Sequence, residues 1–268
     1  MPEWPELRVM QERIAAALVG RAVVAVRVGD PVVLRAVKPV EELLVGRTLR
    51  SVTHRGKLLI FAFDGLDMTV NPMLAGIFAL VPAGTKATKD TRLRLEFEGA
   101  TELRYRDDVR MGKVYVGIEA PGLAEIGPDA GTIDWSDAEF VERAKAKRSE
   151  LRNLLQDQTF VSGIGNAYAD EILWDAKLHP KRRVGSLTTA ELSRLHRSLR
   201  SVVARGRAAV EAAMPPDLGR KPRGHLRVRG RAGSSCPRCG TTLIRRRKGL
   251  DDVDLCPTCQ PAPKGQLY

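Results

Sequence analysis

Four cysteines are the residues whose type and spacing point most clearly to chemistry. Cys236 and Cys239 form one Cys-x-x-Cys turn, and after sixteen residues Cys256 and Cys259 form a second. Two such turns joined by a short arm can place four thiolates at the corners of a tetrahedron, the geometry that Zn²⁺ prefers. Because a closed four-thiolate site has no open position, we expect one structural zinc ion. The alternative is two disulfides, which need an oxidising compartment. Since no signal peptide is recognisable, we favour zinc and a cytoplasmic location.

The N-terminus offers a second reactive group. Residue 2 is a proline, and a small residue in that position favours removal of Met1, which leaves Pro2 as the terminal amine. An α-amine has a pKa of about 7.7–8, against about 10.4 for lysine, so a far larger share of it is unprotonated at neutral pH. Such an amine can attack a sugar C1′, and Glu3 beside it can transfer protons. The alternative is that these residues only lead into a helix.

The charge of the chain indicates its partner. The formal net charge is +12, and residues 220–248 contain eleven Lys or Arg and no Asp or Glu. A basic run next to a cysteine hairpin predicts binding to phosphate backbones. With 5% aromatic residues, a broad base-stacking platform is not expected. No apolar stretch reaches the ~20 residues of a membrane span, so we expect no membrane contact.

The first half of the chain must position the N-terminus. Leu7, Met10, Ile14 and Leu18 recur at helical spacing, and Gly20 ends this helix. Short β-rich runs separated by Gly, Pro and Asp follow, at 23–28, 32–34, 50–52, 57–63, 68–70, 93–98, 103–105 and 113–116. This order predicts a helix followed by a β-sandwich.

The second half changes class after a Gly- and Pro-containing stretch at 121–128. Helical patterns are found at 137–146, 150–155, 168–174 and 188–212. Between the second and third lies a turn with Gly163, Gly165 and Asn166, whose backbone N–H groups could face an anion or could form a plain interhelical turn. Residues 214–224 are expected to form a linker or loop. The fold class is therefore α+β, divided into a catalytic domain at 1–127, a helical domain at 128–220, and a linker with a zinc-finger β-hairpin at 221–268.

Taken in order, these pieces resemble one family. The chain opens with Met-Pro-Glu-x-Pro-Glu, carries Arg-Gly-Lys-Leu-Leu at 55–59 and Gly-Ile-Gly-Asn-Ala-Tyr-Ala-Asp-Glu-Ile-Leu at 163–173, and closes with the cysteine pairs. The set resembles the formamidopyrimidine-DNA glycosylase and endonuclease VIII family of base-excision repair enzymes over essentially the whole chain. The resemblance implies a monomeric glycosylase and abasic-site lyase acting on double-stranded DNA. A damaged base is flipped out and excised, and the strand is then cut by β,δ-elimination.

The resemblance also implies roles for single residues. Pro2 corresponds to the proline that forms a Schiff base with the damaged nucleotide, Glu3 to the general acid/base, and Glu6 to a supporting carboxylate. Lys57 corresponds to the lysine that contacts the lesion phosphate, and Asn166 to the asparagine that holds the bent backbone. The other expected DNA contacts are Leu74, Arg110, Met111, Arg245, Arg246 and Arg247.

The chain departs from the family pattern at several of these positions. The residues expected to fill the void left by the flipped base are Leu74, Val109 and Met111, and Val109 cannot hydrogen-bond an orphaned cytosine. The arginine of the finger falls on Asp251, so either a neighbouring arginine replaces it or catalysis is weakened. Residues 213–224 look shorter than the segment that caps 8-oxoguanine in relatives, which favours oxidised pyrimidines or bulkier lesions.

Two other functions fit parts of the sequence. A catalytically weak protein that binds damaged or bent DNA on the same scaffold is favoured by Asp251 and Val109, whereas Pro2, Glu3 and Lys57 favour the enzyme. A zinc-ribbon protein associated with RNA or ribosomes would explain the basic finger. It would leave the N-terminal motif and the turn at 163–166 without a purpose.

Overall fold

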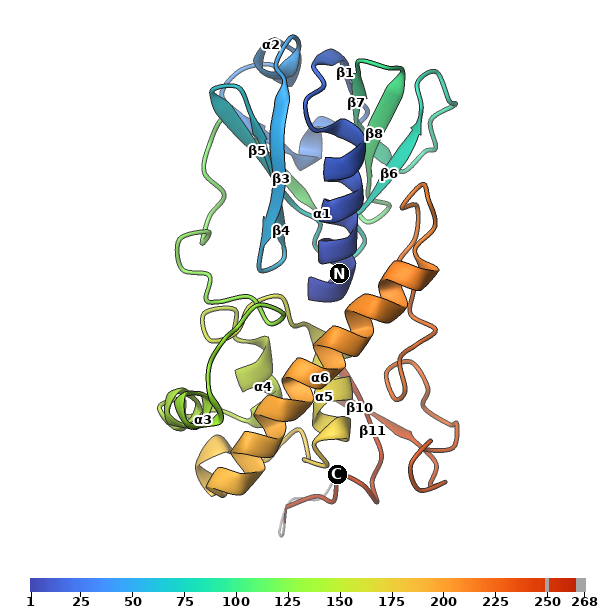
Figure 1. The fold of residues 1–268 in the computed structure, drawn as a ribbon. Coiled ribbons are helices and arrows are strands. Elements are labelled where there is room, and N and C mark those ends of the chain that lie inside the picture. The colour runs from blue at the N-terminus through green and yellow to red at the C-terminus, as the bar shows by residue number, and fades with distance from the viewer. Residues whose placement is uncertain (249–250, 264–268) are drawn as a thin grey trace. The chain divides into compact units, whose positions relative to one another are not determined.

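A computed structural model describes residues 1–248 and 251–263 of the chain (Figure 1). Its contacts divide the chain into two compact units. The first comprises Met1–Glu125 and Val210–Pro222, and the second comprises Ile126–Ala209 and Arg223–Tyr268. The three-part functional division drawn from the sequence at 127/128 and 220/221 stays a prediction.

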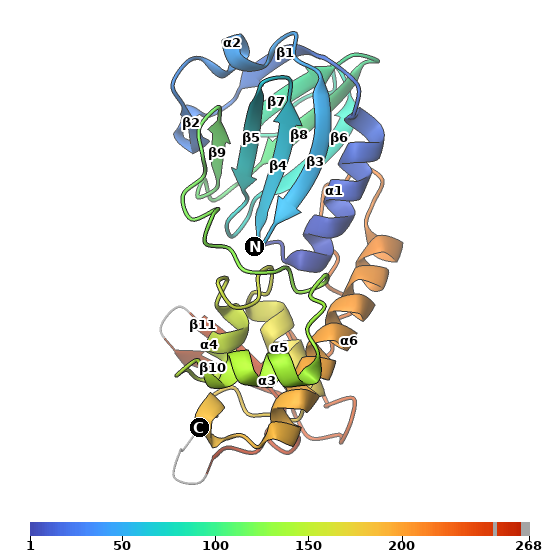
Figure 2. The same cartoon turned by 60° about the vertical axis from the view of Figure 1, so that its left-hand side comes forward.

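The first unit begins with helix α1 (Trp4–Leu18). Glu3 is its N-cap residue, and the buried Glu6 carboxylate accepts the Glu3 backbone N–H at 3.0 Å. This bond satisfies one of the N–H groups that a helix start leaves without a partner. The predicted apolar stripe from Leu7 to Leu18 is fully buried, and α1 lies along strand β3 (Figure 2). The start of the chain is thus fixed on a rigid element.

Two sheets complete the predicted β-sandwich (Figure 2). One has the order β2 (Leu34–Ala36), β9 (Lys113–Val116), β5 (Leu66–Asn71), β4 (Leu58–Phe63) and β3 (Leu49–Arg55). The other has the order β1 (Val23–Val28), β7 (Thr91–Phe97), β8 (Thr101–Arg106) and β6 (Ile77–Pro82). The strands pair antiparallel apart from β2 with β9, and buried aromatic side chains such as Phe61 and Phe78 pack together in the core.

Among the helices and strands of this unit, the sequence prediction differs from the structure at three places. Residues 31–33 form a 3₁₀ turn instead of starting a strand, because Pro31 opens the turn and the Asp30 side chain accepts the Val32 N–H. Strand β6 and the short helix α2 (Val40–Leu44) were not predicted. Strand β6 is a short apolar run, which periodicity alone does not assign to helix or strand, and the five residues of α2 are too few to show a helical period.

The segment expected to be a linker is instead part of the first unit's core. Met214 and Leu218 are buried among its apolar residues, and the Leu80 N–H of edge strand β6 donates to the Asp217 carbonyl at 3.0 Å. The Arg13 guanidinium donates to three carbonyl oxygens at the end of helix α6 (Thr189–Ala213), those of Glu211, Met214 and Pro215, at 2.8–3.1 Å. Residues 210–222 are therefore held in place along much of their length.

The second unit is helical and ends in the predicted hairpin. Its helices are α3 (Asp137–Lys145), α4 (Leu151–Gln156), α5 (Asn166–Asp175) and the greater part of α6. The hairpin consists of β10 (Ile244–Lys248) and β11 (Asp251–Leu255). A ring cluster of Trp135, Phe140, Phe160 and His196 packs inside the unit. None of the helices in the described ranges has the length and apolarity needed to cross a bilayer.

Candidate active site and nucleic-acid interface

Two cationic groups meet at one carbonyl oxygen in the first unit. The Met1 amine donates to the Leu74 carbonyl at 2.6 Å, and Lys221 Nζ donates to the same oxygen at 3.3 Å. Pro2 and Glu3 are buried directly behind the terminal amine. The sequence prediction had not included Lys221; its only local signal was a lysine in the basic, proline-rich stretch after α6. The structure thus brings a second amine to the start of the chain.

Lys57 lies in the turn of the β3–β4 hairpin, one residue before the strand in which the sequence placed it. Gly56 precedes it with a φ of 57°, a conformation that glycine adopts without steric cost. Burial lowers the pKa of Lys57, and the negative charge of Glu3 acts in the opposite direction. The two side chains therefore influence each other electrostatically. The hairpin turn brings a desolvated lysine into the surroundings of the N-terminus.

Three large apolar side chains near this centre are exposed. Leu74 is 56% exposed on the loop between β5 and β6, and Val109 and Met111 are 50% and 40% exposed on the loop between β8 and β9. Between the last two, Arg110 has a φ of 62°, and its Nε donates to Asp30 at 2.6 Å. The hydrogen bond from this guanidinium lowers the pKa of Asp30. The apolar residues predicted to enter DNA thus face solvent, while Arg110 already binds a carboxylate.

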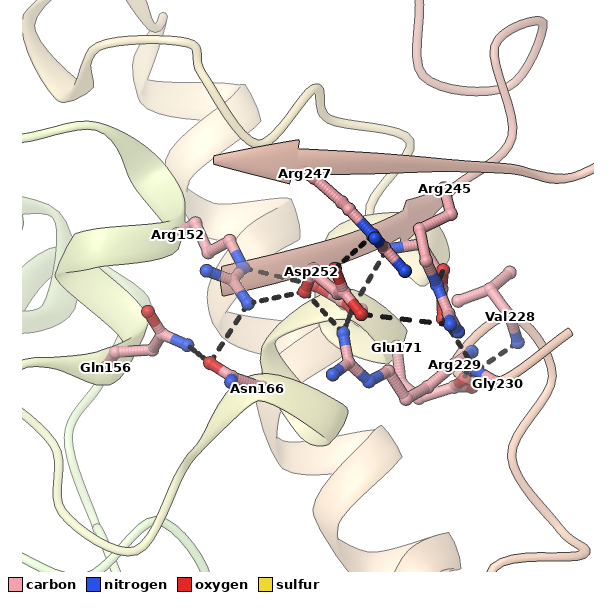
Figure 3. A network of polar contacts seen from close by, with 12 residues as sticks. Arg152, Gln156, Asn166, Glu171, Val228, Arg229, Gly230, Arg245, Arg247 and Asp252 are labelled. Atoms are coloured by element: carbon pink, nitrogen blue, oxygen red, sulfur yellow. Dashed lines mark hydrogen bonds and ion pairs between the residues drawn. The ribbon is translucent and has the colours of Figure 1, made fainter. Parts of the chain in front are cut away.

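Some hydrogen-bonding groups in the turn between α4 and α5 are already bonded to other residues of the second unit. The Gly163 N–H, a candidate for anion binding, donates to the Gln158 side chain at 2.9 Å. Asn166 Oδ1 accepts hydrogen bonds from Arg152, at 3.0 Å, and from Gln156 (Figure 3). Because a guanidinium can only donate, the oxygen of the Asn166 amide must face Arg152. Its NH₂ group then points elsewhere and is available as a donor to a phosphate.

Asp170, one turn further along α5, binds the hairpin. Its carboxylate forms ion pairs with Arg152, at 3.3 Å, and Arg229, at 2.8 Å, and accepts the Asp254 N–H of β11 at 3.1 Å. Burial raises the pKa of Asp170, while the two guanidiniums act in the opposite direction. The neighbouring Glu171 accepts three consecutive backbone N–H groups, those of Arg227, Val228 and Arg229, at 2.8–2.9 Å (Figure 3). One helix therefore carries the turn asparagine and also fixes the finger.

The arginines of β10 are distributed over both faces of the hairpin. Arg245 pairs with Asp254 through two hydrogen bonds of 2.7 and 2.8 Å, whereas the 79% exposed side chain of Arg247 lies 3.4 Å from Asp252. Arg246 is opposite Val253 and therefore points to the other face. The acid-free basic run is thus partly neutralised by the next strand. The side chain of Asp251, where the family's arginine was expected, lies outside the described residues.

A cavity of about 710 Å³ borders this hairpin within the second unit. The basic side chains that line it are Arg152, Lys181, Arg245, Arg246 and Arg247. Val253 and Leu255 provide apolar surface, and Glu150 provides one carboxylate. The lining combines cations with apolar surface, which suits contact with a phosphodiester backbone and its sugars.

The four cysteines converge as the sequence predicted. Their Sγ atoms all lie within 4.8 Å of one another, and three of the pairs are separated by 3.5–4.0 Å. A disulfide requires about 2.05 Å, so these sulfurs are not bonded to each other. Zn–S bonds of about 2.3 Å in a tetrahedron give sulfur separations of roughly 3.8 Å, which these distances fit. The cluster can therefore hold a metal ion.

Trp174, at the far end of α5, reaches this cluster. Its indole N–H donates to Cys236 Sγ at 3.4 Å, and the ring is 2% exposed. The Arg238 guanidinium lies 4.0 Å from the ring centroid and donates to the Trp174 carbonyl at 2.7 Å. The sequence prediction included the cysteines but not this tryptophan, because the contact depends on how the hairpin packs on α5.

Comparison with known proteins identifies the family. Residues 1–114 match the model of the formamidopyrimidine-DNA glycosylase N-terminal domain, and residues 126–213 match the model of the formamidopyrimidine-DNA glycosylase H2TH domain. The formamidopyrimidine-DNA glycosylase of Acidothermus cellulolyticus is 34% identical over 98% of this chain and 99% of its own length. This chain belongs to the formamidopyrimidine-DNA glycosylase family. The glycosylase of Salinispora arenicola is also 34% identical, over 100% of the chain and 99% of its own length.

Solved structures of the family share the fold. A complex of wild-type Lactococcus lactis Fpg with DNA containing N7-benzyl-Fapy-dG superposes with a TM-score of 0.87 at 25% identity, covering 97% of this chain and 100% of that one. A complex of the Lactococcus lactis protein with abasic-site DNA gives a TM-score of 0.86 over the same shares. The fold predicted from the sequence is thus confirmed, and the protein is a DNA repair glycosylase.

Proposed function

We propose that this glycosylase is bifunctional: it excises a damaged base from double-stranded DNA and then cuts the strand at the abasic site. The observation that carries the proposal is the grouping of the N-terminus, the buried Glu3 and the desolvated Lys57 in one unit. In the reaction, the Pro2 amine exposed by loss of Met1 is the nucleophile, Glu3 transfers protons, and Lys57 binds the phosphate of the damaged nucleotide.

The chemistry follows from these groups. The lone pair of the Pro2 nitrogen forms a bond to C1′ while the N-glycosidic bond breaks, and the departing base takes a proton. Opening of the sugar ring then gives an iminium ion, which acidifies the C2′ hydrogens. Loss of a C2′ proton expels one flanking phosphate by β-elimination, and δ-elimination expels the other. A secondary amine suits this sequence because its iminium ion has no N–H proton to lose and therefore keeps its positive charge.

DNA contacts are proposed in both units. In the first, Leu74, Val109 and Met111 enter the base stack, since apolar side chains can open a base step. In the second, the Asn166 NH₂ group binds a phosphate and the hairpin contributes Arg246 and Arg247. Arg245 was predicted alongside them, but it already binds Asp254. We therefore assign it a smaller contribution to DNA binding than Arg246 and Arg247. Arg110 is similarly held by Asp30, and the buried Glu6 supports the helix start instead of meeting DNA directly.

We further propose that the four cysteines hold one structural zinc ion and that the protein acts as a monomer in the cytoplasm. With all four positions filled by thiolates, the metal would stabilise the hairpin and would not take part in the reaction. The metal site is supported by the sulfur distances.

We propose the substrate as a chemical class of damaged bases. Relatives bear the name formamidopyrimidine-DNA glycosylase, and solved neighbours were bound to DNA containing Fapy-dG or an abasic site. We propose oxidised bases as the substrates, with ring-opened purines included. Because residues 210–222 are held against the first unit, we expect them not to close over a base, so oxidised pyrimidines should be accepted as well.

Borohydride trapping tests the proposal. Reduction should produce a covalent protein–DNA adduct on duplexes carrying an oxidised base or an abasic site, and mass mapping should place the adduct on Pro2. An uncleaved N-terminal tag should abolish trapping, whereas Pro2→Gly, which keeps a terminal amine, should retain part of it. An adduct on Lys57 or Lys221, with activity unaffected by the tag, would refute the assignment. Absence of trapping and excision on every lesion would favour a non-catalytic binder of damaged DNA.

A further inference from the structure

The two loops with the exposed apolar residues share one anchoring side chain. Residues 72–76, the Leu74 loop, and residues 107–112, the Met111 loop, follow different strands in different sheets. Tyr105, on β8, is 2% exposed, and its ring belongs to the aromatic row that also contains Phe78. Its hydroxyl lies against the backbone of both loops.

The glycines of the loops show how close this approach is. A Cβ atom on Gly76 would lie 2.5 Å from the Tyr105 hydroxyl, and one on Gly112 would lie 1.7 Å from it. Both values are below the 3.0 Å that real Cβ contacts respect. Glycine therefore suits both places: at Gly112 the tyrosine oxygen is the nearest obstacle to a side chain, and at Gly76 the tyrosine oxygen and the Pro72 carbonyl oxygen, 2.4 Å away, obstruct it together.

Asp107 extends this anchor into the Met111 loop. Its buried carboxylate accepts the Gly112 N–H at 2.7 Å and the Val109 N–H at 3.1 Å, and it lies 3.5 Å from the Tyr105 hydroxyl. Burial, together with the charge of Asp107, raises the pKa of Tyr105 well above its usual value, so the hydroxyl keeps its proton. The pair thus fixes the backbone on both sides of the exposed Met111.

The Leu74 loop is fixed in a comparable way. The Met73 N–H donates to the Asn71 side chain at 3.1 Å, and the Gly76 N–H donates to the Pro72 carbonyl at 2.8 Å. These bonds define the shape of the Leu74 loop. Its contact with the Tyr105 hydroxyl connects it to the Met111 loop. Two short loops with exposed apolar tips are in this way connected through a single oxygen atom.

We propose that Tyr105, together with Asp107, is a positioning residue. It holds the Leu74 and Met111 loops at a fixed separation, so that the two loops enter the damaged duplex together. The inference rests on the proposed function. Opening a base stack requires side chains that do not yield when they meet the bases, and a buried aromatic residue between the sheets provides such support. Tyr105 itself need not touch DNA.

The first test compares Tyr105→Phe with Tyr115→Phe, a matched control on β9 of the same sandwich. Tyr105→Phe should lower excision from duplex DNA by about three- to tenfold, the range that corresponds to one hydrogen-bonding group. The fluorescence rise of 2-aminopurine opposite a tetrahydrofuran site, which reports unstacking of that base, should fall in parallel. Borohydride trapping on single-stranded abasic DNA should stay unchanged, because no stack has to be opened there. Tyr115→Phe should behave as the wild type in all three assays.

Further variants separate positioning from general damage. In a Leu74→Ala/Val109→Ala/Met111→Ala background, Tyr105→Phe should have little additional effect, because the loops then carry no large apolar side chains to position. Gly112→Ala should impair duplex activity, and Tyr105→Phe should restore it only in part, because it removes the oxygen at 1.7 Å from the new methyl group but leaves the ring carbon Cζ at 2.9 Å. Gly76→Ala should not be restored, because its Cβ would also lie 2.4 Å from the Pro72 carbonyl. Asp107→Asn, which preserves shape, should reproduce the duplex-specific loss if Tyr105→Phe folds poorly.

The outcomes distinguish this inference from the proposed function. If the wild type forms no adduct on any abasic DNA, the proposed function fails. If the wild type forms the adduct but Tyr105→Phe and Asp107→Asn match it on duplex DNA, the positioning role is refuted. Equal losses on duplex and single-stranded substrates would refute it too, since they would show that the site as a whole had been disturbed.

Discussion

The Arg152 guanidinium donates to Oδ1 of Asn166 at 3.0 Å, and this contact orients the amide. Asn166→Ala should weaken binding to intact and damaged duplexes alike, by about tenfold or more, because a hydrogen bond to a charged group contributes about 1.5–3 kcal/mol. Asn166→Asp should be worse, since it keeps the acceptor facing Arg152 but replaces the NH₂ group with an oxygen that repels phosphate. Fluorescence anisotropy at several salt concentrations measures both. A loss restricted to one lesion would indicate base readout instead.

Asp254 and Asp252 of the hairpin should differ in their importance for stability. Asp254→Asn should destabilise the protein by about 1–3 kcal/mol, because the buried carboxylate accepts two bonds from Arg245 and one from the Gly230 N–H. Asp252→Asn, the matched control on the same strand, should cost less than about 1 kcal/mol, because its nearer partner Arg247 is 79% exposed and Arg245 is 3.8 Å away.

The difference in stability between the wild type and Asp254→Asn should depend on pH, in a direction that follows from the pKa of Asp254. Despite its burial, the pKa of Asp254 is lowered below its ordinary value of 3.8, chiefly by the hydrogen bond from Arg245. The stabilisation is therefore fully present above pH 3.8 and is lost as the pH falls through the lower folded-state pKa. Thermal melts of wild type and Asp254→Asn should converge in acid. A gap that stayed constant between pH 7 and pH 2 would contradict this account.

Lys57 should oppose folding at neutral pH. Because burial lowers its pKa below the ordinary 10.5, the unfolded chain binds the proton more tightly than the folded one. The destabilisation is fully present below the folded-state pKa and disappears as the pH rises to about 10.5. Lys57→Gln should therefore be more stable than the wild type at pH 7, with a smaller advantage at pH 10, while losing DNA cleavage. Chemical denaturation at both pH values measures this, and a variant less stable than the wild type at pH 7 would contradict it.

Metal binding should depend on the contact between Trp174 and Cys236. Elemental analysis should find one zinc ion per chain, and Cys239→Ser should lose it together with DNA binding while the first unit stays folded. Trp174→Phe should transfer zinc to a chelator about tenfold faster, the lower end of the usual effect of residues that support metal ligands. Trp135→Phe, in the aromatic cluster of the same unit, is the control. Metal-free wild type with full DNA affinity would refute the zinc proposal.

Glu3 should matter more for excision than for strand cleavage. Glu3→Gln cannot protonate a departing base, whereas an abasic site has already lost its base. Excision from an oxidised-base duplex should fall by at least about a hundredfold, with cleavage at a preformed abasic site reduced much less. Single-turnover rates on the two substrates test this, and equal losses on both would assign Glu3 to a later step.

Much of the fold could be predicted from the sequence because its signals are local. The stripe from Leu7 to Leu18 specifies a buried helix, the alternation at 93–98 specifies a strand, and Thr188 caps the helix expected to start there. The segment at 210–222 could not be predicted in this way. Its prolines and charges resemble those of a linker, and only contact with Arg13 and with the apolar core shows that it is fixed.

For the candidate site, the sequence by itself determined the reactive groups: the N-terminal Pro-Glu pair, the lysine after Gly56, the turn asparagine and the four cysteines. These groups can be recognised in the sequence because the chemistry of each depends on one residue or on a few residues close together in the chain. Only the tertiary structure decided which of the charged side chains remain available to bind DNA. Arg245 and Arg229 belong to a run without acids, yet Asp254, nine residues further along, binds Arg245, and Asp170, 59 residues earlier, binds Arg229. Lys221 and Trp174 gain their importance from neighbours 147 and 62 residues away, and Tyr105 from its contact with the Leu74 loop, which follows β5 of the other sheet, because packing brings together groups that no local pattern relates.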